Sequence, residues 1–218
     1  MILGIETATA HGDVALVEGA RLLGHEPLEG GRQRHAAALL LAIDALLTRV
    51  GRPLEDVEGI ALSIGPGSFT SLRIGLSTAL GLCFGTGRWI APVPTLAALA
   101  STAPAGEAIV PMLDARKGQV YTAVYASDGT SLTPDCVVAP LAWLESLDGD
   151  AYCLLGPGVA TCRDQIEQVL GRRAQLLDAS PDAASVARLG AKLADAGRVQ
   201  APGDVELRYV RAPDIGAP

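Results

Sequence analysis

Residues 59–70 read Gly-Ile-Ala-Leu-Ser-Ile-Gly-Pro-Gly-Ser-Phe-Thr, an apolar run that leads into a Gly-Pro-Gly turn. We expect a buried strand over residues 59–64, followed by a helix that continues to about Gly85. The order returns at residues 152–158, where Tyr-Cys-Leu-Leu runs into a second Gly-Pro-Gly, and a helix is expected from there to about Leu170. A pattern that occurs twice in one chain indicates internal duplication.

An acid-bearing hairpin precedes each copy of this pattern. Ile2–Ile5 and Val14–Val17 are expected strands, and the polar turn between them starts at Glu6. Residues 108–125 repeat the arrangement, with Asp114 in the place that Glu6 holds in the first hairpin. Both copies therefore put a carboxyl group at the end of an apolar strand.

The rest of the chain fits two α/β subdomains. One helix is expected after each hairpin, over residues 32–50 and 140–147. The sequence predicts a subdomain of residues 1–103 and a second of residues 104–218, because the polar, Pro- and Gly-containing stretch around residues 101–107 marks a boundary.

Two further elements are expected beyond the second copy. Ser180 with Pro181 is expected to cap a helix that ends near Gly197. Val205–Val210 is expected to be extended.

The composition is typical of a folded protein. The 218 residues are 49% hydrophobic and 19% charged, which excludes an intrinsically disordered chain. The net charge of -7 argues against a surface that grips nucleic acid alone, so a partner would supply the cations if RNA is involved. The start lacks the basic region of a signal peptide, and no apolar stretch approaches the length of a membrane span, so we expect a cytoplasmic protein without membrane contact.

Two helices carry more apolar surface than one small protein needs. Residues 59–106 hold only Arg73 and Arg88 as charges, and the helix over residues 32–50 is apolar nearly all round. Both helices could lie inside a three-layer fold. We favour a partner whose helices complete the burial, because exposed apolar patches mark interfaces.

The loops that could hold a phosphate are open to a second interpretation. The turn before residue 70 offers backbone N–H groups at a helix start, which is an anion site. However, residues 59–106 contain no Asp or Glu for a ribose and the loop contains no Lys, so neither a dinucleotide fold nor a P-loop is expected. The glycines could simply form a tight turn that Ser68 caps. The candidate phosphate or nucleotide contacts are Glu6, Thr7, Gly65, Gly67, Ser68, Thr70 and Asp114.

Catalytic and metal-binding patterns are sparse. His11, His25 and His35 are too far apart in the sequence for a helical metal pair, and the four cysteines form no C-x-x-C pair. Glu6 and Asp114 could hold Mg²⁺ or a water, although acids in turns are more often caps. We expect no metal and no cofactor.

Three segments resemble the signature segments of the TsaB family, also called YeaZ. They are Ile5-Glu-Thr-Ala-Thr9, Gly65-Pro-Gly-Ser-Phe-Thr-Ser-Leu-Arg-Ile-Gly75 and Asp114-Ala-Arg-Lys-Gly-Gln-Val-Tyr121. The resemblance implies a duplicated actin-like fold of the ribonuclease H-like (ASKHA) kind. It also implies a role in forming N6-threonylcarbamoyladenosine at position 37 of tRNAs that read ANN codons. Glu6 stands where the family usually has Asp, and Ser71 where it usually has Gly.

The resemblance further implies a non-catalytic subunit. In the family, the paralogue TsaD carries the metal-binding histidines and performs the transfer, TsaB is its dimerisation partner, and TsaE is an ATPase that acts on the pair. Contact with tRNA would be indirect, and a homodimer is expected when the partner is absent. The residues expected at the pairing surface are His35, Leu39, Leu40, Ile43, Leu46, Leu47, Phe69, Leu72, Arg73, Leu76 and Leu80.

Two enzyme classes remain as alternatives. An actin-like ATPase or small-molecule kinase would use Glu6, Asp114 and the Gly65 loop. A metallopeptidase, suggested by the glycoprotease label of relatives of this fold, is disfavoured because no histidine pair has the required spacing.

Overall fold

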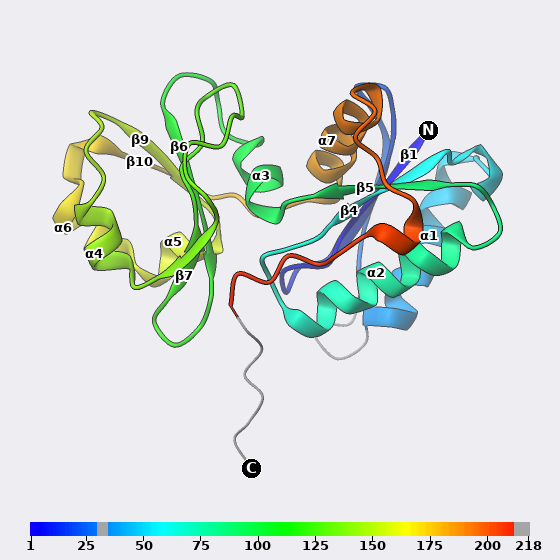
Figure 1. Cartoon of the computed structure of the whole chain (residues 1–218), viewed down its shortest axis with the longest axis horizontal. Helices are drawn as coiled ribbons and strands as arrows, with labels where there is room; N and C mark the ends of the chain where they lie inside the picture. The colour runs from blue at the N-terminus through cyan, green and yellow to red at the C-terminus, as the bar shows by residue number, and fades with distance from the viewer. Residues whose placement is uncertain (30–34, 212–218) are drawn as a thin grey trace, which may run out of the picture. The chain divides into compact units, whose positions relative to one another are not determined.

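The computed structural model describes residues 1–29 and 35–211, with side chains from Ala37 onward in the second range. The chain forms two compact units. The first contains Met1–Ala98 and Pro181–Arg208, and the second contains Leu99–Ser180 and the segment from Tyr209. Each unit is built on a five-stranded sheet covered by helices (Figure 1).

The first sheet has the strand order β3-β2-β1-β4-β5. At its centre β1 (Ile2–Glu6) pairs antiparallel with β2 (Asp13–Glu18) and parallel with β4 (Gly59–Ser63). The outer strands are β3 (Arg21–Pro27), antiparallel to β2, and β5 (Trp89–Val93), parallel to β4. Both central strands are almost entirely buried, as expected of strands that are covered on two faces.

The two faces of this sheet receive different helices. On β4, Ala61 lies against Gly190 of α7 (Ala183–Asp195), and the next residue, Leu62, lies against Gly75 of α2 (Phe69–Cys83). Because successive side chains of a strand point to opposite faces, α2 and α7 cover opposite sides. The other helix of this unit, α1 (His35–Val50), lies beside α2 and packs against β2 and β3 (Figure 1).

The second sheet repeats this plan. Its strand order, starting from β8, is β8-β7-β6-β9-β10, which corresponds strand by strand to β3-β2-β1-β4-β5 of the first sheet. Its central strand β6 (Ala108–Asp114) again pairs antiparallel with the next strand, β7 (Val120–Thr122), and parallel with a later one, β9 (Tyr152–Leu155). The outer strands are β8 (Cys136–Val138), antiparallel to β7, and β10 (Ala174–Leu177), parallel to β9. The same order and directions in both units confirm the predicted duplication of one α/β plan.

The Gly-Pro-Gly turns also correspond between the units. Gly65 and Gly156 both have a φ of +112°, in the region that favours glycine. Added Cβ atoms would lie 2.5 Å from the carbonyl oxygen of Arg208 and 2.3 Å from that of Met112, respectively. Each turn therefore needs glycine both for its backbone conformation and for close packing.

The helices of the second unit are shorter than expected. The first is α4 (Pro140–Glu145). The predicted single helix to Leu170 is instead divided into α5 (Pro157–Thr161) and α6 (Arg163–Val169), because Cys162 has a non-helical φ of -134°. Val159 of α5 and Ile166 of α6 both reach the core of this unit.

The position of α7 changes the expected division of the chain. The compact units differ from residues 1–103 and 104–218, because the segment 181–208 packs on the first sheet. Gly4 makes this possible, since a Cβ there would lie 2.2 Å from the carbonyl oxygen of Ala183. The cap of α7 is Asp182, whose carboxylate accepts from the Ser185 N–H at 2.6 Å, and the predicted cap at Ser180 is wrong.

Several strands and one short helix of the structure were not predicted from the sequence. They are β3, β5, β8, β10 and the short helix α3 (Thr95–Ala100). Val205–Val210 forms no strand, although the Arg208 N–H donates to the Ile64 carbonyl at 2.8 Å. Within the described ranges, every helix is too short or too polar to cross a bilayer.

Candidate partner-binding face

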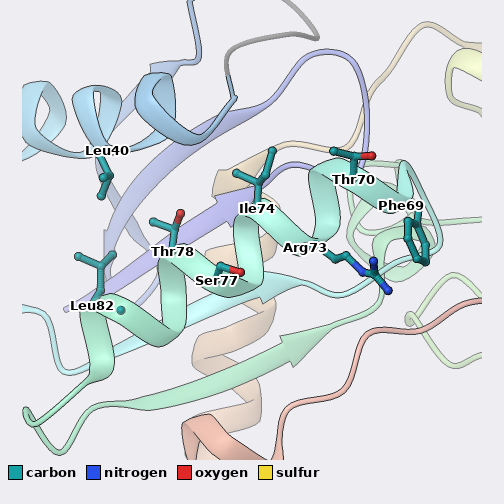
Figure 2. Close-up of a pocket in the computed structure, with 9 residues that line it drawn as sticks. Leu40, Phe69, Thr70, Arg73, Ile74, Ser77, Thr78 and Leu82 are labelled. Carbon is teal, nitrogen blue, oxygen red and sulfur yellow. The ribbon is translucent and has the colours of Figure 1, made fainter.

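A hollow of about 720 Å³ lies along α2 and reaches α1 (Figure 2). Apolar side chains and hydroxyl groups dominate its surface. The residues that line it are Leu40, Phe69, Thr70, Arg73, Ile74, Ser77, Thr78, Gly81 and Leu82. We refer to this surface as the docking face.

The α2 helix is held rigidly under this face. In the middle of the helix, Gly75 lies so close to the β1–β2 turn that an added Cβ would be 2.4 Å from the Thr7 hydroxyl oxygen. Beyond its end, the Arg88 guanidinium donates to the carbonyls of Leu54, Val57 and Leu82 at 2.7, 2.8 and 3.0 Å. Ser68 occupies the N-cap position, but its side chain makes no capping hydrogen bond to the backbone.

The structure separates the predicted interface residues by their burial. Five of them are buried in the core of the first unit, so they stabilise the fold and cannot be the first points of contact: Leu39, Ile43, Leu46, Leu47 and Leu72. Leu76 and Leu80 are half-buried against the same core. Leu40, Phe69 and Arg73 line the docking face, and the side chain of His35 lies outside the described residues.

Two exposed apolar side chains, one on α1 and one directly after α2, are absent from the predicted interface residues. Leu41 is 70% exposed beside Leu40, which is 53% exposed. Phe84, directly after α2, is 88% exposed and is one of only two phenylalanines in the chain. The rarity of phenylalanine and the position of Phe84 in a glycine-containing loop were signals that could have identified it.

A second hollow of about 540 Å³ continues the apolar surface along α1. It shares Leu40 and Leu82 with the docking face and ends among charged side chains that include Asp44, Arg52 and Glu55. In the docking face itself, Arg73 is the one charged residue among the described lining residues. Its guanidinium lies 3.7 Å from the centroid of the Phe69 ring, a cation–π contact that orients both side chains.

Glu6 is enclosed rather than open to a ligand. It is fully buried at the end of β1, where Oε1 accepts from the Ala8 N–H at 2.5 Å. Burial raises the pKa of Glu6 to about 7, although hydrogen bonds from Ser63 and from neighbouring backbone N–H groups partly oppose the rise. The neighbouring Thr7 is also buried.

Asp13, opposite Glu6 on β2, links three elements of the first unit. Its carboxylate accepts from the Ala183 N–H at 3.0 Å and lies 2.7 Å from Nε2 of His25 on β3. Burial raises the pKa of Asp13 to about 6, and the hydrogen bonds from Ala183 and His25 limit that rise. Asp13 therefore anchors the start of α7 to the sheet.

The Gly65 loop is occupied by contacts within the chain. The Gly65 carbonyl accepts from the Thr95 N–H at 2.9 Å, and the Ser68 N–H donates to the Ala8 carbonyl at 2.7 Å. Gly67 packs so closely that a Cβ would lie 2.5 Å from the same Ala8 oxygen. These contacts favour a structural tight turn. Thr70, one turn further, is exposed and lines the docking face.

Asp114 belongs to the second unit, whereas the other candidate phosphate contacts belong to the first. It is exposed, and its Oδ1 accepts from the Arg116 N–H at 2.7 Å, as in an Asx turn. Across residues 1–29 and 35–211, no three His, Cys, Asp or Glu side chains gather in a way that could hold a metal ion.

Known proteins of one family resemble this chain over most of its length. A Bacillus subtilis protein, "tRNA threonylcarbamoyladenosine biosynthesis protein TsaB", is 31% identical over 178 residues, which are 79% of this chain and 77% of that protein. The chain belongs to the TsaB family. The TsaB proteins of Escherichia coli and Haemophilus influenzae are 35% and 33% identical, and the matches span 55% and 51% of their lengths.

Solved structures confirm the fold of this TsaB chain. A Pseudomonas aeruginosa protein described as similar to peptidase YEAZ has a TM-score of 0.82 at 27% identity, with 96% of this chain and 99% of that chain covered. A second structure, YeaZ from Pseudomonas aeruginosa, has a TM-score of 0.80 at 26% identity and covers 95% of this chain and 98% of that chain. The duplicated actin-like fold is confirmed, and component A of (R)-2-hydroxyglutaryl-CoA dehydratase from Acidaminococcus fermentans shares it at a TM-score of 0.56 and 11% identity, with 89% of this chain and 98% of that chain covered.

This TsaB chain is also related to transferases. The family model described as "TsaD: tRNA N6-adenosine threonylcarbamoyltransferase" matches residues 27–196. A protein of that name from Solidesulfovibrio magneticus is 34% identical over 102 residues, which are 40% of this chain and 28% of that protein. TsaB proteins thus belong to the tRNA threonylcarbamoyladenosine biosynthesis pathway, and this chain is similar to the transferases that share its fold.

Proposed function

We propose that this TsaB chain is a non-catalytic subunit that binds a TsaD-type threonylcarbamoyltransferase through α1 and α2. In that role it would support formation of N6-threonylcarbamoyladenosine at position 37 of tRNAs that read ANN codons. The observation that carries the proposal is the docking face, an apolar hollow on two rigid helices with Leu40 more than half exposed at its edge.

The energetics favour burial of this surface by another protein. Full burial of one exposed leucine or phenylalanine contributes about 1.5–3 kcal/mol. Leu40, Leu41 and Phe84 are three such side chains on or next to the same helix pair. Apolar anchors of this kind supply most of the affinity of protein interfaces.

Similarity between the two proteins supports the choice of partner. The residues that match the transferase model, 27–196, include both α1 and α2. A transferase with an equivalent helix pair can present a related apolar face, and two related faces can pair about an approximate two-fold axis. Pairing of this chain with a second copy when the transferase is absent, and a TsaE-type ATPase acting on the heterodimer, belong to the same proposal.

The candidate loops give support to a non-catalytic role. Glu6 is buried, and the Gly65 loop is packed against Ala8, Thr95 and Arg208. We expect calorimetry of the isolated chain with Mg-ATP to give no binding isotherm. Tight binding of Mg-ATP would instead favour the actin-like ATPase or kinase alternative.

Co-purification with the transferase of the same organism tests the pairing. We expect Leu40→Asp to lower the affinity at least tenfold, because a carboxylate in a closed apolar interface costs several kcal/mol. Leu132→Asp is the matched control, since Leu132 is 58% exposed in the second unit and should retain wild-type affinity. Leu40 is a better probe than Leu76, which packs against the core.

A circular dichroism melt of each variant checks that it is folded. Full retention of the transferase by folded Leu40→Asp would contradict the proposed interface.

A further inference from the structure

The connection between β6 and β7 brings together much of the positive charge of the second unit. The sequence gives this unit six Lys and Arg residues. Arg116 and Lys117 lie in the connection and are exposed, and Arg211 reaches it from the far end of the chain. We call residues 114–119 together with Arg211 the basic turn.

The backbone of the basic turn holds its two exposed cations in an unusual conformation. Arg116, Lys117 and Gly118 have φ values of 60°, 53° and 70°, so three consecutive residues are left-handed. This conformation is unfavourable for residues that carry a Cβ, and here local hydrogen bonds maintain it. The Ala115 N–H donates to the Gln119 carbonyl at 2.9 Å, and the Gln119 N–H donates to the Arg116 carbonyl at 3.0 Å.

Arg211 adds a third positive charge to the basic turn and stabilises its conformation through hydrogen bonds. Its guanidinium donates to the Ala115 carbonyl at 2.8 Å and also to the side-chain oxygen of Gln119. It lies 6.0 Å from the centroid of the half-buried Tyr121 ring. The one acidic residue in the turn, Asp114, accepts from the Arg116 N–H, and the three cations Arg116, Lys117 and Arg211 outnumber it, so the basic turn has a net positive charge.

We propose that the basic turn contacts the phosphodiester backbone of the tRNA directly. Cations on a fixed turn bind phosphate with little loss of side-chain and backbone freedom, and arginine pairs with phosphate through two parallel donors. The site stands out because the chain as a whole carries a charge of -7. The proposal rests on the tRNA pathway of the family, and it departs from the expectation that a partner alone supplies the cations.

The other cations of the second unit supply a matched control. Arg163 lies on α6 near Glu167, at 3.9 Å, and Arg172 is exposed in the next short turn. The double variant Arg163→Gln/Arg172→Gln therefore removes the same charge from the same unit, away from the basic turn. In the test variant, Arg116→Asn/Lys117→Asn, asparagine removes both charges and tolerates the left-handed conformation.

The experiment measures fluorescence anisotropy of a labelled, unmodified tRNA transcript titrated with the chain and its transferase at several KCl concentrations. We expect Arg116→Asn/Lys117→Asn to weaken tRNA binding about tenfold at low salt. The slope of the logarithm of the binding constant against the logarithm of the KCl concentration should become less steep by about 1–2, because each neutralised phosphate contributes about one to this slope. The Arg163→Gln/Arg172→Gln control should stay within about twofold of wild type, as expected of charges that make no phosphate contact.

Three results would overturn the proposal: unchanged binding by Arg116→Asn/Lys117→Asn, equal loss in the control, or displacement of tRNA by excess Mg-ATP at constant ionic strength. Loss of the transferase rather than of tRNA from this variant would also overturn it, since the basic turn would then bind protein. If the wild-type chain fails to bind the transferase at all, the proposed pairing fails, and titration of the chain alone at low salt still compares the variants.

Discussion

Glu6 shows how a buried carboxyl group makes the stability of a protein depend on pH. Its pKa rises from 4.5 to about 7 because burial penalises the charged form. Between these values the folded chain binds the proton more tightly than the unfolded chain does, so stability falls as the pH rises from 4.5 to 7. Above pH 7 the loss is complete, and it amounts to about 3 kcal/mol at most.

We therefore expect Glu6→Gln to stabilise the protein at pH 8 and to have little effect at pH 4.5. Glutamine has nearly the same shape, keeps an oxygen for the Ala8 N–H and carries no charge to bury. Urea unfolding of both proteins at the two pH values measures the difference. A Glu6→Gln variant that is no more stable than wild type at pH 8 would show that burial of the Glu6 carboxylate does not destabilise the folded protein.

Substitution of Phe84 tests whether this single side chain contributes to binding of the transferase. Because its side chain is 88% exposed, Phe84→Ala should change the free energy of unfolding by less than about 0.5 kcal/mol. Its affinity for the transferase should fall about tenfold or more, as for other aromatic anchors. Calorimetric titration measures the affinity, and Leu132→Ala serves as the control. Equal affinities of Phe84→Ala and wild type would place Phe84 outside the interface.

At the scale of elements, two glycines of α2 should respond to alanine in opposite ways. A Cβ at Gly75 would lie 2.4 Å from the buried Thr7 hydroxyl, whereas nothing lies within 4 Å of a Cβ at Gly81. We expect Gly75→Ala to destabilise the fold by about 1–3 kcal/mol through overpacking. Gly81→Ala should stabilise it by about 0.5–1 kcal/mol, because alanine restricts the unfolded chain and favours the helix.

Denaturant unfolding of the two variants at one pH measures this contrast. If Gly75→Ala is as stable as Gly81→Ala, then α2 can shift away from the β1–β2 turn at little cost, and the rigid support of the docking face is wrong.

The elements also show what the sequence could and could not predict. The duplication was visible because both Gly-Pro-Gly turns follow buried apolar strands, and Gly65 and Gly156 indeed share one backbone conformation. β3 was missed because its exposed and partly exposed residues, such as Arg21 and Glu26, lack the apolar run of a central strand. Strand β8 is only three residues long, too short for a periodicity to appear.

The docking face was predicted at the level of helices and only in part at the level of side chains, since Leu40, Phe69 and Arg73 line it whereas the leucine stripe of α1 does not. The stripe through Leu39, Ile43 and Leu46 follows helical spacing, but that spacing marks the side of α1 that faces its own sheet. Leu41 and Phe84 break the pattern and are therefore the exposed groups. Apolar residues at helical spacing identify the buried side of a helix, whereas a surface that binds another protein consists of apolar residues outside that spacing.

At the scale of the whole molecule, charge is distributed unevenly between the candidate surfaces. The docking face has Arg73 as the one charge among its described lining residues, and the basic turn gathers Arg116, Lys117 and Arg211. The two proposed contacts should therefore respond differently to salt. Added salt should lower the affinity for tRNA steeply and leave the affinity of the apolar pairing nearly unchanged. Measurement of both affinities over one series of KCl concentrations separates the two contacts.

The placement of α7 has a consequence for biosynthesis. The strands of the first sheet, within residues 2–93, leave the ribosome early, but the helix of residues 183–195 that covers one face of this sheet is made only after every strand of the second sheet. Until then, the flat side around Gly4 and Ala61 has no cover from its own chain, and nascent protein with such a surface is prone to aggregate. A messenger truncated before codon 181 should therefore yield insoluble product, even though it encodes every strand of both sheets.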